Sequence, residues 1–192
     1  MVKNTKRSVR SGEAMDELYK QMIPDLNATL PSNPNPTWKQ MAALGVRLKG
    51  AVVMGHSESG FFPEQAALID PTGIRGLVSI EMPCVTNLTA AQIGTLAKIP
   101  TLVMFGDHLT ENPGSRAGEL GEAFASCNTF LEQLKKAGGD AEMIHLPALG
   151  IHGNSHMLMQ DRNSDQLAGL VIAWIDKHVE RKVGRRPRGT TR

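Results

Sequence analysis

A serine between an apolar run and a helix-like segment is the strongest candidate for chemistry in this sequence. Ser57 lies in GHSESG (55–60). A sharp strand-to-helix turn exposes a nucleophilic serine and needs small residues two places before and after it, here Gly55 and Ser59. The helix N-terminus favours negative charge near that serine, so the amide of Glu58 is a candidate oxyanion donor. The common pattern G-x-S-x-G differs only in its last place, where this chain has a second serine.

Two histidines near the end of the chain could activate this serine. A serine hydroxyl is a weak nucleophile at neutral pH, so an imidazole must take its proton and later protonate the leaving group. The loop 147–156 follows the last strand-like segment and carries both His152 and His156. We favour His156, because it leads directly toward the final helix, and keep His152 as the alternative. The other four histidines are interpreted as surface or strand-end residues: His56, His108, His145 and His178.

Two carboxylates could orient that histidine. Glu81 ends the apolar run 76–80, at the carboxyl end of a strand, where ligand-facing residues of a parallel sheet gather. A carboxylate in such a place needs a partner, because unpaired burial costs several kcal/mol. Asp107 follows the next apolar run, 101–105, and is the alternative. We favour Glu81 as the residue that fixes the imidazole.

Strand-like and helix-like segments alternate along most of the chain, which positions these residues. Alternation with helices of ten or more residues predicts right-handed crossovers and an α/β fold, with about four parallel strands and helices on both faces. Strands are expected at 51–54, 76–80, 101–105 and 142–146, and helices at about 11–22, 36–48, 59–69, 90–96, 120–137 and 164–178, with an irregular stretch rich in Pro and Asn at 25–36.

Composition predicts one globular domain with charged tails. The chain has 192 residues, 41% of them hydrophobic and 21% charged. Ten of its 21 basic residues lie in 1–10 and 181–192, which leaves 11 against 19 acidic residues between the tails. The tails lack aromatic residues for base stacking, so we interpret them as solvated and disordered and expect no nucleic-acid partner. The predicted organisation is an N-terminal tail, helix and loop (1–34), a core (35–180) and a basic tail (181–192).

Metal, redox and membrane signals are weak. Cys84 and Cys127 are isolated thiols without metal-ligand spacing, and a disulfide between them is possible but not implied. His152 and His156 have no further ligand cluster around them, so we expect no metal and no cofactor. No run approaches the roughly 18 apolar residues that span a bilayer, and the first residues lack a secretory signal. A natural N-terminus would predict a cytoplasmic protein; otherwise the compartment stays open.

Together these residues resemble the α/β-hydrolases, and in particular a small group of bacterial esterases with an H-S-x-S-G elbow. The resemblance runs from about Asn35 to Ile175 and includes VSIE, IPTLVMFGDH and LPALGIHGNSHMLMQDRN. It implies that Ser57 is the nucleophile, His156 the base and Glu81 the acid. It also implies cofactor-free hydrolysis of a small-molecule carboxylic ester through an acyl-enzyme intermediate.

The chain departs from that family before its first strand. Family members have a further N-terminal half, which supplies about four strands and the loop with the second oxyanion N–H. Nothing comparable precedes Ala51. We therefore expect the C-terminal part of an α/β-hydrolase fold, and an exposed sheet edge that favours a homo-oligomer or pairing with another chain. The alternative function is a catalytically silent hydrolase-like module that binds a ligand or an N-terminal partner.

Overall fold

The computed structural model describes residues 16, 20, 35–109 and 116–180, and the chain divides into two compact units, Met1–Pro36 and Thr37–Arg192. In the first unit, Asp16 and Lys20 are helical, and the rest of the helix expected at 11–22 lies outside the described residues. Of the irregular stretch expected at 25–36, only residues 35 and 36 are described. The basic tail expected at 181–192 lies outside the described residues.

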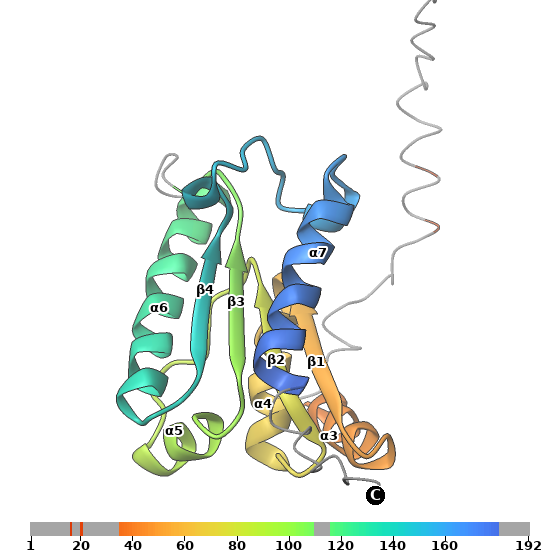
Figure 1. Cartoon of the computed structure of the whole chain (residues 1–192), viewed down its shortest axis with the longest axis vertical. Helices are drawn as coiled ribbons and strands as arrows, with labels where there is room; N and C mark the ends of the chain where they lie inside the picture. Colours follow the sequence, from red (N-terminus) through yellow and green to blue (C-terminus); the bar gives the residue numbers. More distant parts are fainter. Residues whose placement is uncertain (1–15, 17–19, 21–34, 110–115, 181–192) are drawn as a thin grey trace, which may run out of the picture. The chain divides into compact units, whose positions relative to one another are not determined.

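Four parallel strands form the sheet of the second unit, in the order in which they occur along the chain (Figure 1). They are β1 (Ala51–His56), β2 (Ile74–Ile80), β3 (Thr101–Phe105) and β4 (Ala141–His145). Gly55 pairs with Ser79 and Phe105 with His145, so the carboxyl ends of the four parallel strands lie close to one another. The expected α/β class with about four parallel strands is confirmed.

Five α-helices accompany the strands in the described part of the chain. They are α3 (Pro36–Arg47), α4 (Phe62–Ile69), α5 (Ala90–Leu96), α6 (Arg116–Lys136) and α7 (Ser164–Ile175), the last followed by a π-helix, Asp176–Glu180. Side chains alternate along β2: Leu77 joins the core beneath α4, α5 and α6, whereas Val78 joins the core beneath α7. Helices therefore cover both faces of the sheet, as the alternating pattern predicts.

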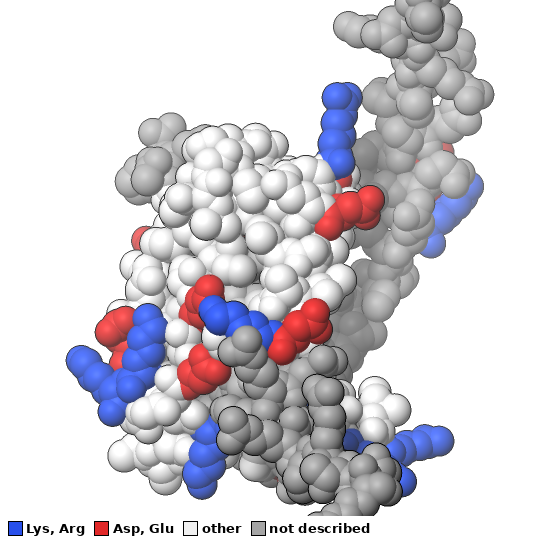
Figure 2. All heavy atoms as spheres, viewed as in Figure 1, with Lys and Arg blue, Asp and Glu red and all other residues white. Residues whose placement is uncertain are grey.

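An apolar groove lies on the α7 face of the sheet beside β1. It measures about 510 Å³, and its lining includes Val52, Met54 and Ile172. Within the described residues β1 pairs with β2 alone, and Met54 in its middle is 59% exposed. Figure 2, which looks at the molecule from the same side as Figure 1, shows charged side chains scattered over the lower part and few over the upper part. In the described part of the chain, β1 is thus the edge strand of the sheet and lies next to this apolar groove.

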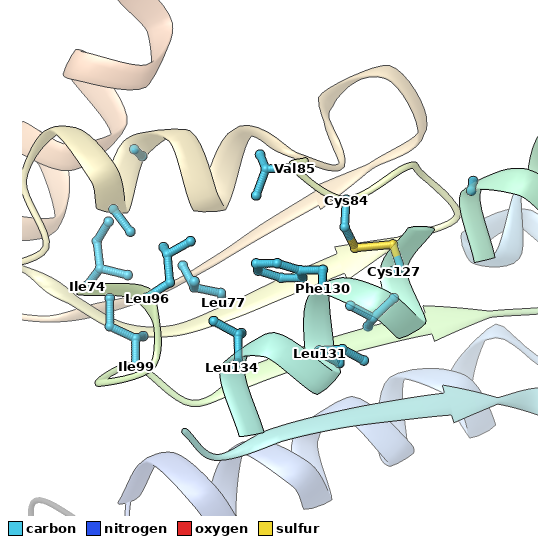
Figure 3. Close-up of a cluster of buried hydrophobic side chains, with 14 of the residues drawn as sticks. Ile74, Leu77, Cys84, Val85, Leu96, Ile99, Cys127, Phe130, Leu131 and Leu134 are labelled. Carbon is cyan, nitrogen blue, oxygen red and sulfur yellow. A yellow bond between two sulfur atoms is a disulfide. The ribbon is translucent and has the colours of Figure 1, made fainter. Parts of the chain in front are cut away.

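A disulfide joins the segment after β2 to α6. Cys84 and Cys127 are bonded, although they are 43 residues apart in the sequence. The bond lies at one end of the larger core, next to Phe130 and Leu131 of α6 (Figure 3). The sequence alone left this pairing as a possibility, and the structure contains it.

Candidate active site

The backbone at Ser57 has the conformation of a strained turn. β1 ends at His56, a single 3-10 turn spans Ser57–Ser59, and the amide of Gly60 donates to the Ser57 carbonyl oxygen at 2.8 Å. Ser57 itself has a φ of 54°, in the left-handed region that costs a residue with a Cβ about 1–3 kcal/mol. This turn, rather than α4, occupies the residues directly after the strand, so the helix expected from 59 begins at Phe62.

Small residues are required around this turn because the chain doubles back on itself. A Cβ at Gly55 would overlap the carbonyl oxygen of Ser59, and one at Gly60 would overlap the side chain of Met82. Ser59 tolerates its position because its side chain turns back, with Oγ donating to the carbonyl of His56 at 3.0 Å. The serine in place of the usual glycine is thus accommodated by a hydrogen bond.

Ser57, His156 and Glu81 are hydrogen-bonded in a row. Nε2 of His156 lies 2.7 Å from Oγ of Ser57, and Nδ1 lies 2.9 Å from Oε2 of Glu81. A carboxylate can only accept here, so Nδ1 donates to Glu81 and Nε2 is left to accept the serine proton. The His156 side chain is 20% exposed and that of Glu81 1% exposed, and Ser57 is half-buried, so the serine and the imidazole open to solvent while the carboxylate does not.

Glu81 is held by its backbone position and by a second donor. It directly follows β2 and has a φ of 51°. Its Oε1 accepts from the amide of Gly106 at 2.6 Å. A Cβ at Gly106 would come within 3.1 Å of that oxygen, so glycine lets the amide approach. Both carboxylate oxygens therefore have partners, which offsets the cost of burying the group.

The alternative acid and base contact each other instead of Ser57. Asp107 Oδ2 accepts from the amide of Asn154 at 3.0 Å, and Oδ1 lies 3.5 Å from Nδ1 of His152. Burial alone would raise the pKa of Asp107, but hydrogen bonds from the amides of Asn154 and Gly153 and the contact with His152 bring it below its usual value. The His152 side chain is 65% exposed. Asp107 therefore fastens the loop that carries His156, rather than the imidazole itself.

A polar network that sequence reasoning missed shapes the same loop. Asn154, only 2% exposed, donates from Nδ2 to Asp161 at 3.0 Å and to Asn163 at 2.8 Å. Ser155 donates to Asp161 from both its amide, at 2.9 Å, and its hydroxyl, at 2.8 Å. The hydrogen bond from Asn154 is the main reason that the pKa of Asp161 lies below its usual value. The loop is thereby closed on itself one residue before His156.

His56 joins the nucleophile turn to the base loop. Its Nε2 donates to the carbonyl oxygen of His156 at 2.7 Å, and the two rings lie 4.8 Å apart. The sequence interpretation placed His56 among surface or strand-end residues; it does end β1, but it also holds the backbone of His156. His178 is not a surface residue either: its side chain is 12% exposed and lies between Asp140 and Glu142.

A buried glutamate lies behind the turn. Glu64 in the first turn of α4 is fully buried and accepts from the hydroxyl of Ser79 at 2.6 Å. Its other oxygen, Oε2, has no hydrogen-bond partner among the described residues. Burial, only partly offset by the Ser79 hydrogen bond, raises the pKa of Glu64 to about 7. Since Ser79 pairs with Gly55, this contact ties α4 to β2 just below the nucleophile turn.

A cavity of about 610 Å³ opens beside the hydrogen-bonded row. Its lining comes from the turn, from the segment after β2 and from α6: Ser57, Glu58, Glu81, Met82, Pro83, Cys84, Thr86, Glu119, Leu120, Glu122, Ala123, Ser126 and His156. Glu58, whose amide the sequence predicts as an oxyanion donor, lies at this cavity.

The described residues include no group of three or more His, Cys, Asp or Glu side chains placed to hold a metal ion. No described helix has the length and apolarity to cross a membrane.

Comparison with known proteins relates the chain to an esterase and to a lipase. The structure superimposes on that of a bacterial esterase with a TM-score of 0.73 and 40% sequence identity, over 87% of this chain and 50% of the esterase chain. The chain is related to esterases. A shorter match, 44% identical over 46 residues, links this esterase-related chain to the probable secreted lipase phiG of Fungal sp. (strain ATCC 74256), over 24% of this chain and 13% of the lipase. No family model matches the sequence.

The esterase-related chain spans about half the length of the esterase that it matches. Its four parallel strands and five helices are thus the equivalent of half of an esterase structure. This relation to an esterase and a lipase, together with the parallel sheet, agrees with the resemblance to α/β-hydrolases on which the sequence interpretation rests.

Proposed function

We propose that this protein is a serine hydrolase that cleaves carboxylic esters through an acyl-enzyme intermediate. The observation that carries the proposal is the hydrogen-bonded row Ser57–His156–Glu81, with contacts of 2.7 and 2.9 Å. Both distances lie within hydrogen-bond reach, which the proton transfer from Ser57 to His156 and the orientation of the imidazole by Glu81 require. The relation to an esterase and a lipase supports the same class of reaction.

The reaction proceeds by two acyl transfers. Oγ of Ser57 attacks the ester carbonyl carbon while its proton passes to Nε2 of His156. The attack converts the carbonyl group into a tetrahedral intermediate with a negative charge on its oxygen. The C–O bond to the alcohol then breaks, and the imidazolium donates that proton to the leaving alcohol. Water then attacks the acyl-enzyme while His156 takes its proton. The bond between Oγ and the acyl carbon breaks, the acid departs, and His156 returns the proton to Oγ of Ser57. Glu81 keeps Nδ1 protonated and stabilises the imidazolium in both halves of the cycle.

The oxyanion is stabilised next to the nucleophile turn. The amide of Glu58 directly follows Ser57 and is the first donor of this proposal, at the start of a turn whose N–H groups favour negative charge. A second donor is not assigned to any described residue. Loss of one such donor lowers the rate by roughly 10²–10³-fold. The presence of a second donor therefore decides how fast this chain hydrolyses an ester on its own.

The substrate is a small ester, and the reaction needs no metal or cofactor in this proposal. A cavity of about 610 Å³ lies in the size range of pockets for small molecules, roughly 300–1,000 Å³. The serine supplies the nucleophile, the imidazole acts as general base and then general acid, and the carboxylate orients the imidazole, so the chemistry is complete without a bound group.

Hydrolysis of p-nitrophenyl acetate tests the proposal. We expect Ser57→Ala to lower kcat/KM by at least ~10³-fold, because the residual reaction lacks the nucleophile. The matched control is Thr129→Ala, which removes a hydroxyl from an exposed position of α6. Equal rates for the wild type and Ser57→Ala would contradict the assignment.

A second candidate function is favoured by the open edge of β1. In this reading the chain is a silent module that pairs through that edge, either with a second copy or with another chain that supplies further strands. The apolar groove next to β1, about 510 Å³, gives such a partner a surface to bury. Light scattering and labelling with a fluorophosphonate distinguish the two: the silent module predicts a complex and an unlabelled Ser57, and the enzyme predicts a labelled one.

A further inference from the structure

The cavity beside Ser57 has two walls that the reaction itself does not use. One is a face of α6, whose lining residues recur at helical spacing: Glu119, Leu120, Glu122, Ala123 and Ser126. The other is the segment that follows Glu81: Met82, Pro83, Cys84 and Thr86. Neither wall takes part in holding the imidazole or the oxyanion, so both are free to determine which ester fits.

We propose that these walls form a subsite for one side of the ester, and that the subsite accepts a compact group that is uncharged or positively charged. The inference deepens the proposed hydrolase function, since the subsite lies next to the reacting serine. It names the class of substrate rather than the reaction.

The size limit follows from a covalent link between the two walls. Cys84 lines the cavity from one side, and it is bonded to Cys127, the neighbour of Ser126 on the other side. Ala123 is 2% exposed and Cys127 is fully buried, so this part of α6 is packed against the core. A wall that is packed and cross-linked cannot move outward for a larger group, because well-packed interiors transmit strain rather than yield. The subsite therefore rejects bulky groups.

The charge preference follows from the side chains at the cavity. Four glutamate side chains belong to its lining, those of Glu58, Glu81, Glu119 and Glu122, and that of Glu81 is paired with His156. The described lining includes no Lys or Arg. An anionic group on the substrate would meet like charge there, and such a juxtaposition is a common means of excluding a wrong ligand. Neutral and cationic groups meet no such barrier.

Ser126→Leu and Thr129→Leu form a matched pair for the size limit. Both hydroxyls bond to carbonyls of their own helix, Ser126 to Ala123 at 2.8 Å and Thr129 to Ala125 at 3.2 Å. Only Ser126 lines the cavity, and Thr129 is exposed. With p-nitrophenyl acetate, butyrate and hexanoate, and with acetates of increasing alcohol size, we expect Ser126→Leu to lower kcat/KM for the larger members of one series by roughly 10-fold. Thr129→Leu leaves the size dependence unchanged.

The series that responds identifies the side of the ester in the subsite. A response to acyl length places the acyl group there, and a response to alcohol size places the alcohol there; each supports the subsite. A uniform effect of Ser126→Leu on every ester, or a size dependence that matches that of Thr129→Leu, would overturn it.

The charge preference is tested with Glu122→Gln and Glu132→Gln, on esters that differ only in a terminal carboxylate or methyl ester. Glu132 is the control, since it pairs with Lys135 at 3.1 Å and does not line the cavity. We expect Glu122→Gln to raise kcat/KM for the anionic ester by about 2- to 5-fold relative to its neutral partner. If the ratio of kcat/KM for the anionic ester to that for the neutral ester is the same in the wild type and in Glu122→Gln, the charge preference is wrong.

Binding to Ser57→Ala separates this inference from the proposed function. Calorimetric titration with p-nitrophenyl hexanoate measures whether the subsite binds the ester without any chemistry. Binding that weakens with Ser126→Leu and not with Thr129→Leu supports the subsite even where the wild type hydrolyses no ester. Binding that both substitutions leave unchanged, in an active enzyme, overturns the subsite and leaves the hydrolase proposal in place.

Discussion

Reduction of the disulfide between Cys84 and Cys127 should cost this chain much of its stability. The bond closes a loop with a sequence separation of 43. The chain-entropy relation for a loop of that length gives about 4 kcal/mol in favour of the folded state. Since domains of this size are stable by roughly 5–15 kcal/mol, the reduced protein keeps only a fraction of its free energy of unfolding. The melting temperature should fall by roughly 8–16 °C.

Urea unfolding followed by tryptophan fluorescence measures this cost, with oxidised and reduced wild type compared in the same buffer. Reduction keeps both sulfur atoms in the core, so the difference isolates the constraint on the loop. A double variant, Cys84→Ala with Cys127→Ala, should lose more, because it also leaves small cavities. A difference below about 1 kcal/mol between oxidised and reduced protein would refute the reasoning that this loop constrains the unfolded chain.

Three further predictions concern the site. Glu81→Gln should lower kcat by about 10³–10⁴-fold with little change in KM, measured with a p-nitrophenyl ester, because the amide no longer fixes the tautomer of His156. The pKa of Glu64 is raised from its ordinary value of 4.5 to about 7 in the folded protein. Its contribution to the free energy of unfolding is therefore complete below pH 4.5 and is lost as the pH rises through 7. Unfolding titrations should therefore show that Glu64→Gln flattens a fall of about 3 kcal/mol across this window, and an unchanged slope would contradict its burial. His56→Ala should lower kcat more than it raises KM, and His56→Asn, which can still donate, should recover part of the loss.

The strands could be predicted closely because β1 and β3 are short, largely apolar runs, and β2 and β4 are short segments rich in apolar residues. β3 begins and ends where the sequence predicts, at Thr101 and Phe105. β1 extends to His56, two residues past the predicted end, since it continues into the nucleophile turn. α4 begins later than predicted because the turn uses a 3-10 geometry for Ser57–Ser59, which apolar periodicity does not encode.

The choice between Glu81 and Asp107 depended on contacts that no local pattern contains. Both carboxylates follow neighbouring strands, so both reach the same edge of the sheet. What separates them is the loop before His156, where the amide of Asn154 takes Asp107 as its acceptor. Glu81 receives the imidazole because it directly follows the last residue of its strand, in a left-handed conformation.

Other parts of the site gave no signal in the sequence. Glu64 stands in the first turn of a helix, where an acidic residue is normally an exposed partner of the helix dipole, yet it is fully buried. The disulfide joins residues 43 apart, and spacing of that kind indicates nothing by itself. The contact of His56 with the loop that carries His156 could have been predicted, because His56 directly precedes Ser57 and so lies at the carboxyl ends of the strands, as that loop does.

The central claim is that Ser57 is a nucleophile activated by His156. Mass spectrometry of the intact protein after incubation with diisopropyl fluorophosphate tests it most directly. The account predicts one phosphoryl adduct per chain, mapped to Ser57 by peptide sequencing and strongly slowed in His156→Ala. A folded wild-type chain that stays unlabelled, or an adduct that maps to a different serine, would contradict it.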